Sequence, residues 1–272
     1  MLDEWSPADL LALAASVARE SGRMLVEDRP EVLVSDSKSS PTDVVTQMDR
    51  ASEALLVEGI LRERPDDGIL GEEGGERAGA SGVRWILDPV DGTTNYLYGL
   101  PIWAVSVGVE CDGVIVAGVV EAPALDRRYF ASLGGGAWEE LGGQIRALRP
   151  TGCESLGMAL VSTGFGYSAE RRARQAEDLR HLAPRVRDIR RLGAASLDLA
   201  WVGAGYVDAY FETGLHPWDV AAGGLIAQEA GARVVTRPGL GPGDDLTVAA
   251  APGIADDLLD ALTSAHGSVD PA

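Results

Sequence analysis

Two aspartates three positions apart give the strongest chemical signal in this sequence. Asp88 and Asp91 follow the apolar run Trp85 to Leu87, which predicts a short buried strand. Pro89 has no backbone N–H, so the chain is expected to turn there rather than continue a ladder. The turn would bring both carboxylates and the carbonyl oxygen of Val90 close together. Hard oxygen ligands of this kind suit Mg²⁺, which makes the segment a candidate metal site.

The residues that follow could bind an anion next to that metal. Gly92, Thr93 and Thr94 could open a helical turn whose free N–H groups face a phosphate group. A simpler interpretation is a polar turn in which Asp88 only caps the next element, and an isolated Asp-x-x-Asp pattern would favour it.

Acids elsewhere in the chain shift the balance towards a metal site. Glu72 follows another short apolar run, and neighbouring glycines let the backbone approach closely. Asp219, after Trp218, stands near the start of a predicted helix, where capping is the simpler role. Asp49 lies one turn beyond Thr46 on another predicted helix, where it could be part of a polar face.

The elements that must hold these acids change in character along the chain. The first part predicts two helices and a group of antiparallel strands, and Asp112-Gly113 is a typical hairpin turn. The predicted helices run from Pro7 to about Glu27 and from Val44 to just before Pro65, and the predicted strands are Trp103 to Glu110, Val114 to Val120 and Tyr129 to Ser132.

Beyond about Pro150 strands and helices alternate. The predicted strands are Met158 to Ser162, Tyr206 to Phe211, Arg233 to Val235 and Val248 to Ala250, and the predicted helices are Ala169 to His181, Ala194 to Val202, Val220 to Ala230 and Ile254 to about Ser264. We therefore divide the chain into an N-terminal α+β domain, residues 1–150, with most candidate metal ligands, and a C-terminal α/β domain, residues 151–272. The fold class predicted for the whole chain is α+β.

Composition excludes several classes of protein. The 272 residues carry 23 Lys plus Arg against 42 Asp plus Glu, a net charge of −19, which argues against a nucleic-acid surface. The same charge would repel an anionic substrate unless bound cations neutralise it locally. No apolar stretch is long enough to span a membrane. With only Cys111 and Cys153 there is no disulfide framework, so we expect a cytoplasmic protein.

Taken together, these segments resemble the inositol monophosphatase family of metal-dependent, lithium-sensitive phosphatases, and most of all its bacterial inositol-1-monophosphatases. The resemblance covers nearly the whole chain. The segments that carry it are Lys38 to Asp43, Glu72, Asp88 to Thr93, Ser162 to Tyr167, Leu192 to Leu199, Trp218-Asp219 and Glu229 to Gly231. The resemblance implies a layered αβαβα sandwich as the fold and a homodimer as the assembly.

The resemblance also implies roles for single residues. Glu72, Asp88 and the Val90 carbonyl would hold a first Mg²⁺, and Asp88, Asp91 and Asp219 a second. Glu72 and, through water, Asp49 would hold a weaker third ion.

A metal-activated water would attack phosphorus in line, and Thr93 with Glu72 would orient that water or take its proton. The catalytic residues are therefore expected to be Glu72, Thr93 and Asp49. Five acids in one site would repel one another without metal. We accordingly expect Asp91→Asn to abolish activity without lowering the melting temperature of the metal-free protein.

Substrate contacts follow from the same resemblance. The phosphate would lie against Asp91, Asp219 and the amides of Gly92 and Thr93, a preorganised donor arrangement. Glu212 would accept hydrogen bonds from substrate hydroxyls, and Ala195 and Arg190 would line the pocket. For Arg190, a solvated ion pair is an equally good interpretation. Many relatives carry Ser or Thr where this chain has Ala194, so one hydroxyl of the pocket is missing.

Inositol-1-phosphate is therefore the first expectation for the substrate, with Mg²⁺ as cofactor and no nucleic-acid or membrane partner. Histidinol phosphate or another small sugar phosphate is the alternative, and bisphosphates rank lower because no extra basic loop is present. A function of another class, a regulatory protein that contacts RNA or the transcription machinery, is also considered. The net charge argues against direct RNA contact but not against a protein partner.

Overall fold

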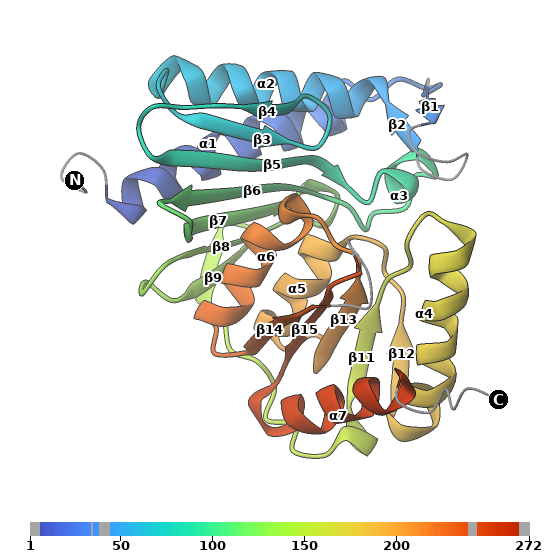
Figure 1. Cartoon of the computed structure of the whole chain (residues 1–272). Coiled ribbons are helices and arrows are strands. Elements are labelled where there is room, and N and C mark those ends of the chain that lie inside the picture. Colours follow the sequence, from blue (N-terminus) through green and yellow to red (C-terminus); the bar gives the residue numbers. More distant parts are fainter. Residues whose placement is uncertain (1–5, 34, 38–43, 239–243, 267–272) are drawn as a thin grey trace.

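Helices and sheets alternate in five layers in the computed structural model of the chain (Figure 1). It describes residues 6–33, 35–37, 44–238 and 244–266. The segment Lys38 to Asp43, which contributed to the family resemblance, lies outside the described residues. The layers run helix, sheet, helix, sheet, helix, so the predicted α+β class and αβαβα sandwich are confirmed.

The first layer is made by two helices. In α1 (Pro7–Glu27) the Ser6 side chain accepts a hydrogen bond from the N–H of Asp9, whose carboxylate accepts one from the N–H of Ser6. The second helix is α2 (Gln47–Glu63), and it starts later than predicted. Val44–Thr46 form strand β2, which pairs with β1 (Ser35–Ser37), because β-branched residues favour an extended chain.

The second layer is an eight-stranded sheet. Its strands, in spatial order, are β10 (Gln144–Ala147), β9 (Ala137–Leu141), β8 (Arg127–Ser132), β7 (Val114–Ala122), β6 (Ala104–Cys111), β5 (Val83–Asp91), β3 (Gly68–Gly71) and β4 (Gly75–Arg77). All neighbours pair antiparallel except β3 and β5, which are parallel. The predicted hairpin of β6 and β7 around Asp112-Gly113 is confirmed.

The third layer consists of α5 (Ala195–Ala204) and α6 (Pro217–Glu229) between the two sheets. Small residues let α6 lie directly on the larger sheet. A Cβ at Gly108 would come within 2.6 Å of Ala221 Cβ, and one at Gly118 within 2.8 Å of Ala222 Cα. The position of α6 is therefore fixed by contact with the strand backbone.

The remaining two layers are a five-stranded sheet and its outer helices. The strand order is β12 (Asp188–Arg190), β11 (Leu160–Thr163), β13 (Ala209–Thr213), β15 (Leu246–Ala250) and β14 (Arg233–Arg237), and the outer helices are α4 (Ala169–Leu182) and α7 (Ala255–His266). One more short helix, α3 (Thr93–Leu97), follows β5. No helix in the described ranges is both long and apolar enough to cross a membrane.

Two predicted strands are displaced. The strand expected at Tyr206 to Phe211 is β13, Ala209–Thr213, so Glu212 lies inside the strand rather than after it. The strand expected from Met158 starts at Leu160, because Leu156–Met158 form a 3₁₀ turn. Each sheet draws its strands from one predicted domain, yet α5 and α6 of the second part share a core with the sheet of the first. The division at residue 150 stays a prediction.

Candidate active site

Three carboxylates from two elements meet at the end of β5. Asp88 and Asp91 lie near the C-terminal end of that strand, and Asp219 lies in the first turn of α6. One carboxylate oxygen from each lies within 4.8 Å of the others. The structure thus brings together residues that are far apart in the sequence.

A bulge in β5 gives the two strand aspartates a common direction. The pairing of β5 with β6 shifts register between Asp88 and Asp91, around Pro89, which has no N–H for the ladder. The N–H of Val90 donates to Asp88 Oδ1 at 3.1 Å, and Ser52 donates to the Pro89 carbonyl at 2.9 Å. The expected turn is present, but the strand continues through it to Asp91 instead of ending at Asp88.

Asp91 also caps helix α5. Its Oδ1 accepts the N–H of Ala195 at 3.0 Å, and its Oδ2 accepts the N–H of Ser196 at 2.7 Å and the hydroxyl of Ser196. A carboxylate is favoured at a helix N-terminus, where free N–H groups and the helix dipole meet it. No local pattern in the sequence pairs Asp91 with Ser196, so this contact could not be predicted.

Asp219 is held in a similar way by its own helix. Its Oδ2 accepts the N–H of His216 at 2.6 Å, which closes a capping box at the start of α6. The rings of His216 and Trp218 stack at 4.8 Å on the same turn. The predicted capping role is present, and it leaves Asp219 facing the other two carboxylates.

Glu72 lies on the loop between β3 and β4 beside Asp88. Glu53 of α2 accepts the N–H of Glu73 at 2.9 Å and that of Gly74 at 2.5 Å, so a buried carboxylate holds this loop from behind. Glu72 lies close enough to Asp88 to raise the pKa of that carboxyl group, after burial, which is the larger cause. Glu72 lines the same cavity as Asp91 and Asp219.

Asp49 is placed differently from the prediction. It is fully buried, its Oδ2 accepts the N–H of Thr46 at 2.9 Å, and its Oδ1 accepts the hydroxyl of Thr93 at 2.8 Å. It is not among the residues that line the cavity, whereas Thr93 is. The structure therefore pairs Asp49 with Thr93, not with the outer metal position for which the resemblance suggested it.

Gly92 must be glycine to make the turn into α3. Its φ is 92°, a value that side chains rarely allow, and a Cβ there would lie 3.0 Å from the Ile102 carbonyl oxygen and 3.1 Å from that of Gly193. Gly92 and Thr93 both line the cavity, as predicted for residues next to a bound phosphate.

The acids raise one another's pKa values. The pKa of Asp88 lies well above its usual value, first because of burial and then because Glu72, Asp91 and Asp219 are close. Burial and the charge of Asp91 likewise raise the pKa of Asp219. Burial raises that of Asp91 too, although the hydrogen bonds from Ser196 and Ala195 oppose the rise. Bound cations would remove this repulsion, and an all-oxygen donor set fits Mg²⁺.

The cavity in front of the carboxylates measures about 130 Å³. Beyond the acids it is lined by Ala195 and Glu212, as predicted, and also by Ala194, Arg171 and Arg191. Burial, the first cause, raises the pKa of Glu212 to about 7. This end of the cavity can accept hydroxyl groups at Glu212.

Arg190 does not line the cavity. It belongs to the edge strand β12 and donates to Asp188 at 2.7 Å on the surface, so the ion-pair interpretation holds for this residue. Successive side chains of an extended chain point to opposite sides, which places Arg191 in the cavity instead. The sequence shows two adjacent arginines, Arg190 and Arg191. Only the register of β12 could have shown which of them faces the cavity.

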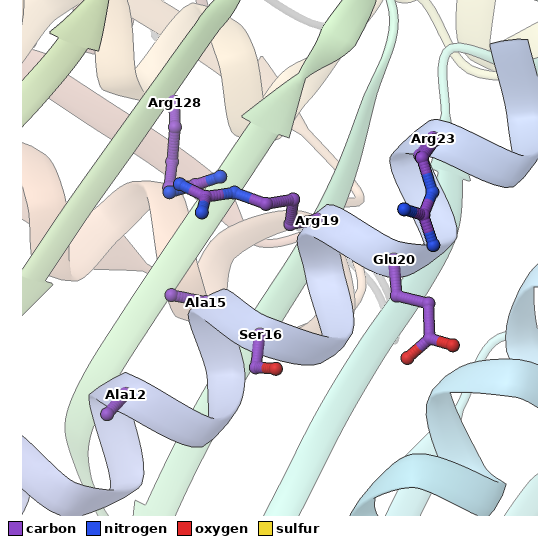
Figure 2. A pocket seen from close by; sticks show the side chains of 7 residues that line it. All are labelled: Ala12, Ala15, Ser16, Arg19, Glu20, Arg23 and Arg128. Carbon is purple, nitrogen blue, oxygen red and sulfur yellow. The ribbon is translucent and has the colours of Figure 1, made fainter. Parts of the chain in front are cut away.

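Another hollow lies far from this chemistry. A groove of about 550 Å³ runs along the outer face of α1, where Arg19, Arg23 and Arg128 stand beside small residues (Figure 2). None of the clustered carboxylates lines it. Arg128 forms ion pairs with Glu121 and Glu140, and Arg19 forms one with Glu140. Most of the positive charge in the groove is therefore neutralised within the protein.

A layered sandwich with a cluster of carboxylates at the end of β5 fits a metal-dependent phosphoric monoester hydrolase. A sequence model of the inositol monophosphatase family matches residues 6–266. The chain belongs to that family.

Individual relatives agree with this assignment. Inositol-1-monophosphatase SuhB of Mycobacterium tuberculosis is 47% identical over an alignment of 279 positions that covers 96% of each chain. The solved structure of Mycobacterium tuberculosis SuhB superposes with a TM-score of 0.84 at 45% identity, covering 96% of this chain and 98% of that one. A protein of Pseudomonas aeruginosa called Nus factor SuhB is 39% identical over 83% of this chain and 84% of its own.

Proposed function

We propose that this chain is a Mg²⁺-dependent phosphomonoesterase that hydrolyses inositol-1-phosphate to inositol and phosphate. The observation that carries the proposal is the meeting of Asp88, Asp91 and Asp219 within 4.8 Å beside the hydrogen-bonded pair of Thr93 and Asp49. The similarity to inositol-1-monophosphatases supports the substrate. Homodimer assembly remains part of the proposal, and light scattering would test it.

The residues that would hold Mg²⁺ are the ones expected for two ions. Glu72, Asp88 and the Val90 carbonyl would hold one ion, and Asp88, Asp91 and Asp219 the other. Glu72 alone would be left for a weaker third ion, because Asp49 is buried and already bonded. When bound, Mg²⁺ supplies charge neutralisation for the phosphate and lowers the pKa of water.

The proton transfer belongs to Thr93 and Asp49. The Thr93 hydroxyl lies 2.8 Å from Asp49 Oδ1 and 3.0 Å from the Val90 carbonyl oxygen, and when it donates its hydrogen to Asp49 its oxygen keeps lone pairs for the cavity. That oxygen can accept a hydrogen from the attacking water while its own hydrogen moves to the carboxylate of Asp49. A buried carboxylate orienting the group that takes the proton is a common arrangement in hydrolases. Glu72, which lines the same cavity, would orient the same water.

Substrate binding divides between the two ends of the cavity. The turn at Gly92 and Thr93 faces the phosphate, and Glu212 accepts hydrogen bonds from leaving-group hydroxyls. Ala194 offers no hydroxyl, so the polyol is recognised mainly through Glu212. A site built for such donors rejects ligands that lack them.

Steady-state kinetics test this proposal. We expect Mg²⁺-dependent phosphate release, lost in excess EDTA, and a higher kcat/KM for inositol-1-phosphate than for histidinol phosphate. Glu212→Ala should cost the polyol substrate about 1–3 kcal/mol of transition-state stabilisation and matter much less for 4-nitrophenyl phosphate. Activity in EDTA would refute the metal dependence, and a tenfold preference for histidinol phosphate would refute the substrate.

One comparison favours a second candidate function. The Pseudomonas aeruginosa relative is called a Nus factor, which fits a regulatory binding protein better than an enzyme. Asp88→Asn separates the two functions, since it would remove phosphate release and leave the outer surface unchanged. A regulatory phenotype that survives in this variant would support the second function.

A further inference from the structure

We propose that Tyr210 and Gly164 fix the position of the Glu212 carboxylate and thereby determine how well the site discriminates polyol leaving groups. This inference rests on the proposed function and deepens it. The sequence analysis assigned neither residue a role, although Gly164 lies in the segment Ser162 to Tyr167 that carries the resemblance.

The first observation is a hydrogen bond along one strand. Tyr210 and Glu212 are two positions apart in β13, so both side chains stand on the same face of the sheet. The Tyr210 hydroxyl donates to Glu212 Oε2 at 2.7 Å. Tyr210 is completely buried, so its ring cannot move without disturbing the core around Leu199 and Ala249.

The second observation is a space that only glycine leaves open. Strands β11 and β13 are parallel, with Ser162 opposite Tyr210 and Thr163 opposite Phe211, so Gly164 comes next to Glu212. A Cβ at Gly164 would lie 1.8 Å from Glu212 Oε2 and 2.4 Å from its Cδ. The carboxylate therefore occupies the volume that any side chain at position 164 would fill.

The space at Gly164 lets the carboxylate take this position, and the hydrogen bond from Tyr210 restrains it there. A glutamate side chain loses rotamer entropy when it is immobilised, and this hydrogen bond imposes part of that loss before a substrate arrives. Glu212 Oε1 is the oxygen that Tyr210 does not bond, so it is the one left to accept substrate hydroxyls. Tyr210 is a positioning residue, since it does not line the cavity; Gly164 lines the cavity but has no side chain, and it acts by leaving room for the Glu212 carboxylate.

Two variants with matched controls test the inference. Tyr210→Phe removes one hydroxyl and keeps the ring, and Gly164→Ala adds one methyl group in the volume that the Glu212 carboxylate occupies. The controls are Tyr129→Phe, another fully buried tyrosine that does not line the cavity, and Gly152→Ala, where an added Cβ would meet nothing within 4 Å.

The readout is the ratio of kcat/KM for inositol-1-phosphate to that for 4-nitrophenyl phosphate. We expect the ratio to fall about tenfold in Tyr210→Phe, as for loss of a hydrogen bond to a charged group, and further in Gly164→Ala. The controls should keep the wild-type ratio. An unchanged ratio in both variants, or equal slowing of both substrates, would overturn the inference while leaving the proposed function intact.

A second measurement does not depend on activity. The hydrogen bond from Tyr210 lowers the pKa of Glu212, so Tyr210→Phe should raise it above its value of about 7. The carboxyl ¹³C shifts of labelled glutamate, titrated in the metal-free protein and assigned with Glu212→Gln, report this pKa. If the wild-type protein hydrolyses neither substrate, the proposed function fails. The titration then still tests whether Tyr210 holds the Glu212 carboxylate. An unshifted pKa would show that Tyr210 does not hold the carboxylate.

Discussion

The Thr93 hydroxyl donates to the Asp49 carboxylate across 2.8 Å, and Asp49 has no exposure to solvent. We expect Thr93→Val to lower kcat by about 10²–10⁴-fold, the usual contribution of a positioned proton acceptor. Thr93→Ser keeps the hydroxyl and should retain most of the rate. Single-turnover kinetics at saturating Mg²⁺ measure the step directly. Equal rates for the serine and valine variants would show that the hydroxyl takes no part.

Asp88 and Asp91 should respond in opposite ways to neutralisation. Asp88→Asn keeps an acceptor for the Val90 N–H and removes a carboxyl group whose pKa is raised first by burial and then by three acidic neighbours, so the metal-free protein should melt at a higher temperature. Asp91→Asn weakens the hydrogen bonds to Ala195 and Ser196, and we expect it to lower the free energy of unfolding by about 1–3 kcal/mol.

A loss of stability in Asp91→Asn would differ from the expectation based on the sequence alone, which was an unchanged or higher melting temperature of the metal-free protein. Calorimetry in EDTA on the two variants decides the matter. Destabilisation by both would mean that repulsion among the acids is weaker than their hydrogen bonds. Both variants should be inactive in Mg²⁺.

The metal-free protein should gain stability as the pH falls from about 8 to about 6. The pKa values of Asp88, Asp219 and Glu212 are raised in the folded state, that of Glu212 to about 7, so the folded state binds more protons than the unfolded chain in this window. Stability therefore decreases as pH rises through the folded-state pKa. Melting temperatures in EDTA across this range test the sign, and Glu212→Gln should flatten the slope.

Gly118→Ala tests whether α6 is held by backbone contact. A Cβ there would lie 2.8 Å from Ala222 Cα, so we expect a loss of about 1–3 kcal/mol of unfolding free energy from overpacking. Weaker Mg²⁺ binding should accompany it, because Asp219 moves with the helix. Gly152→Ala is the matched control. A stable variant with normal Mg²⁺ affinity would show that the helix can shift without moving the ligand.

The sequence predicted those parts of the site that depend on neighbouring residues. A strand end, Pro89 and the spacing of Asp88 and Asp91 are local, and the layered fold followed from the resemblance. Contacts set by register or by packing between layers could not be read in advance. The choice of Arg191 over Arg190 depends on the register of β12, and the capping of α5 by Asp91 joins positions 104 apart.

The distribution of the ligands over the chain has a consequence during synthesis. At about 5–20 residues per second, Asp219 emerges from the ribosome roughly ten seconds after Asp91. Until α6 has been synthesised and has packed on Gly118, Asp88 and Asp91 cannot share an ion with Asp219. The N–H groups of Ala195 and Ser196, which donate to Asp91, are also synthesised after β5. In the nascent chain the site is therefore incomplete and its acids repel one another. A bound ion can stabilise the fold only after the whole chain has been synthesised.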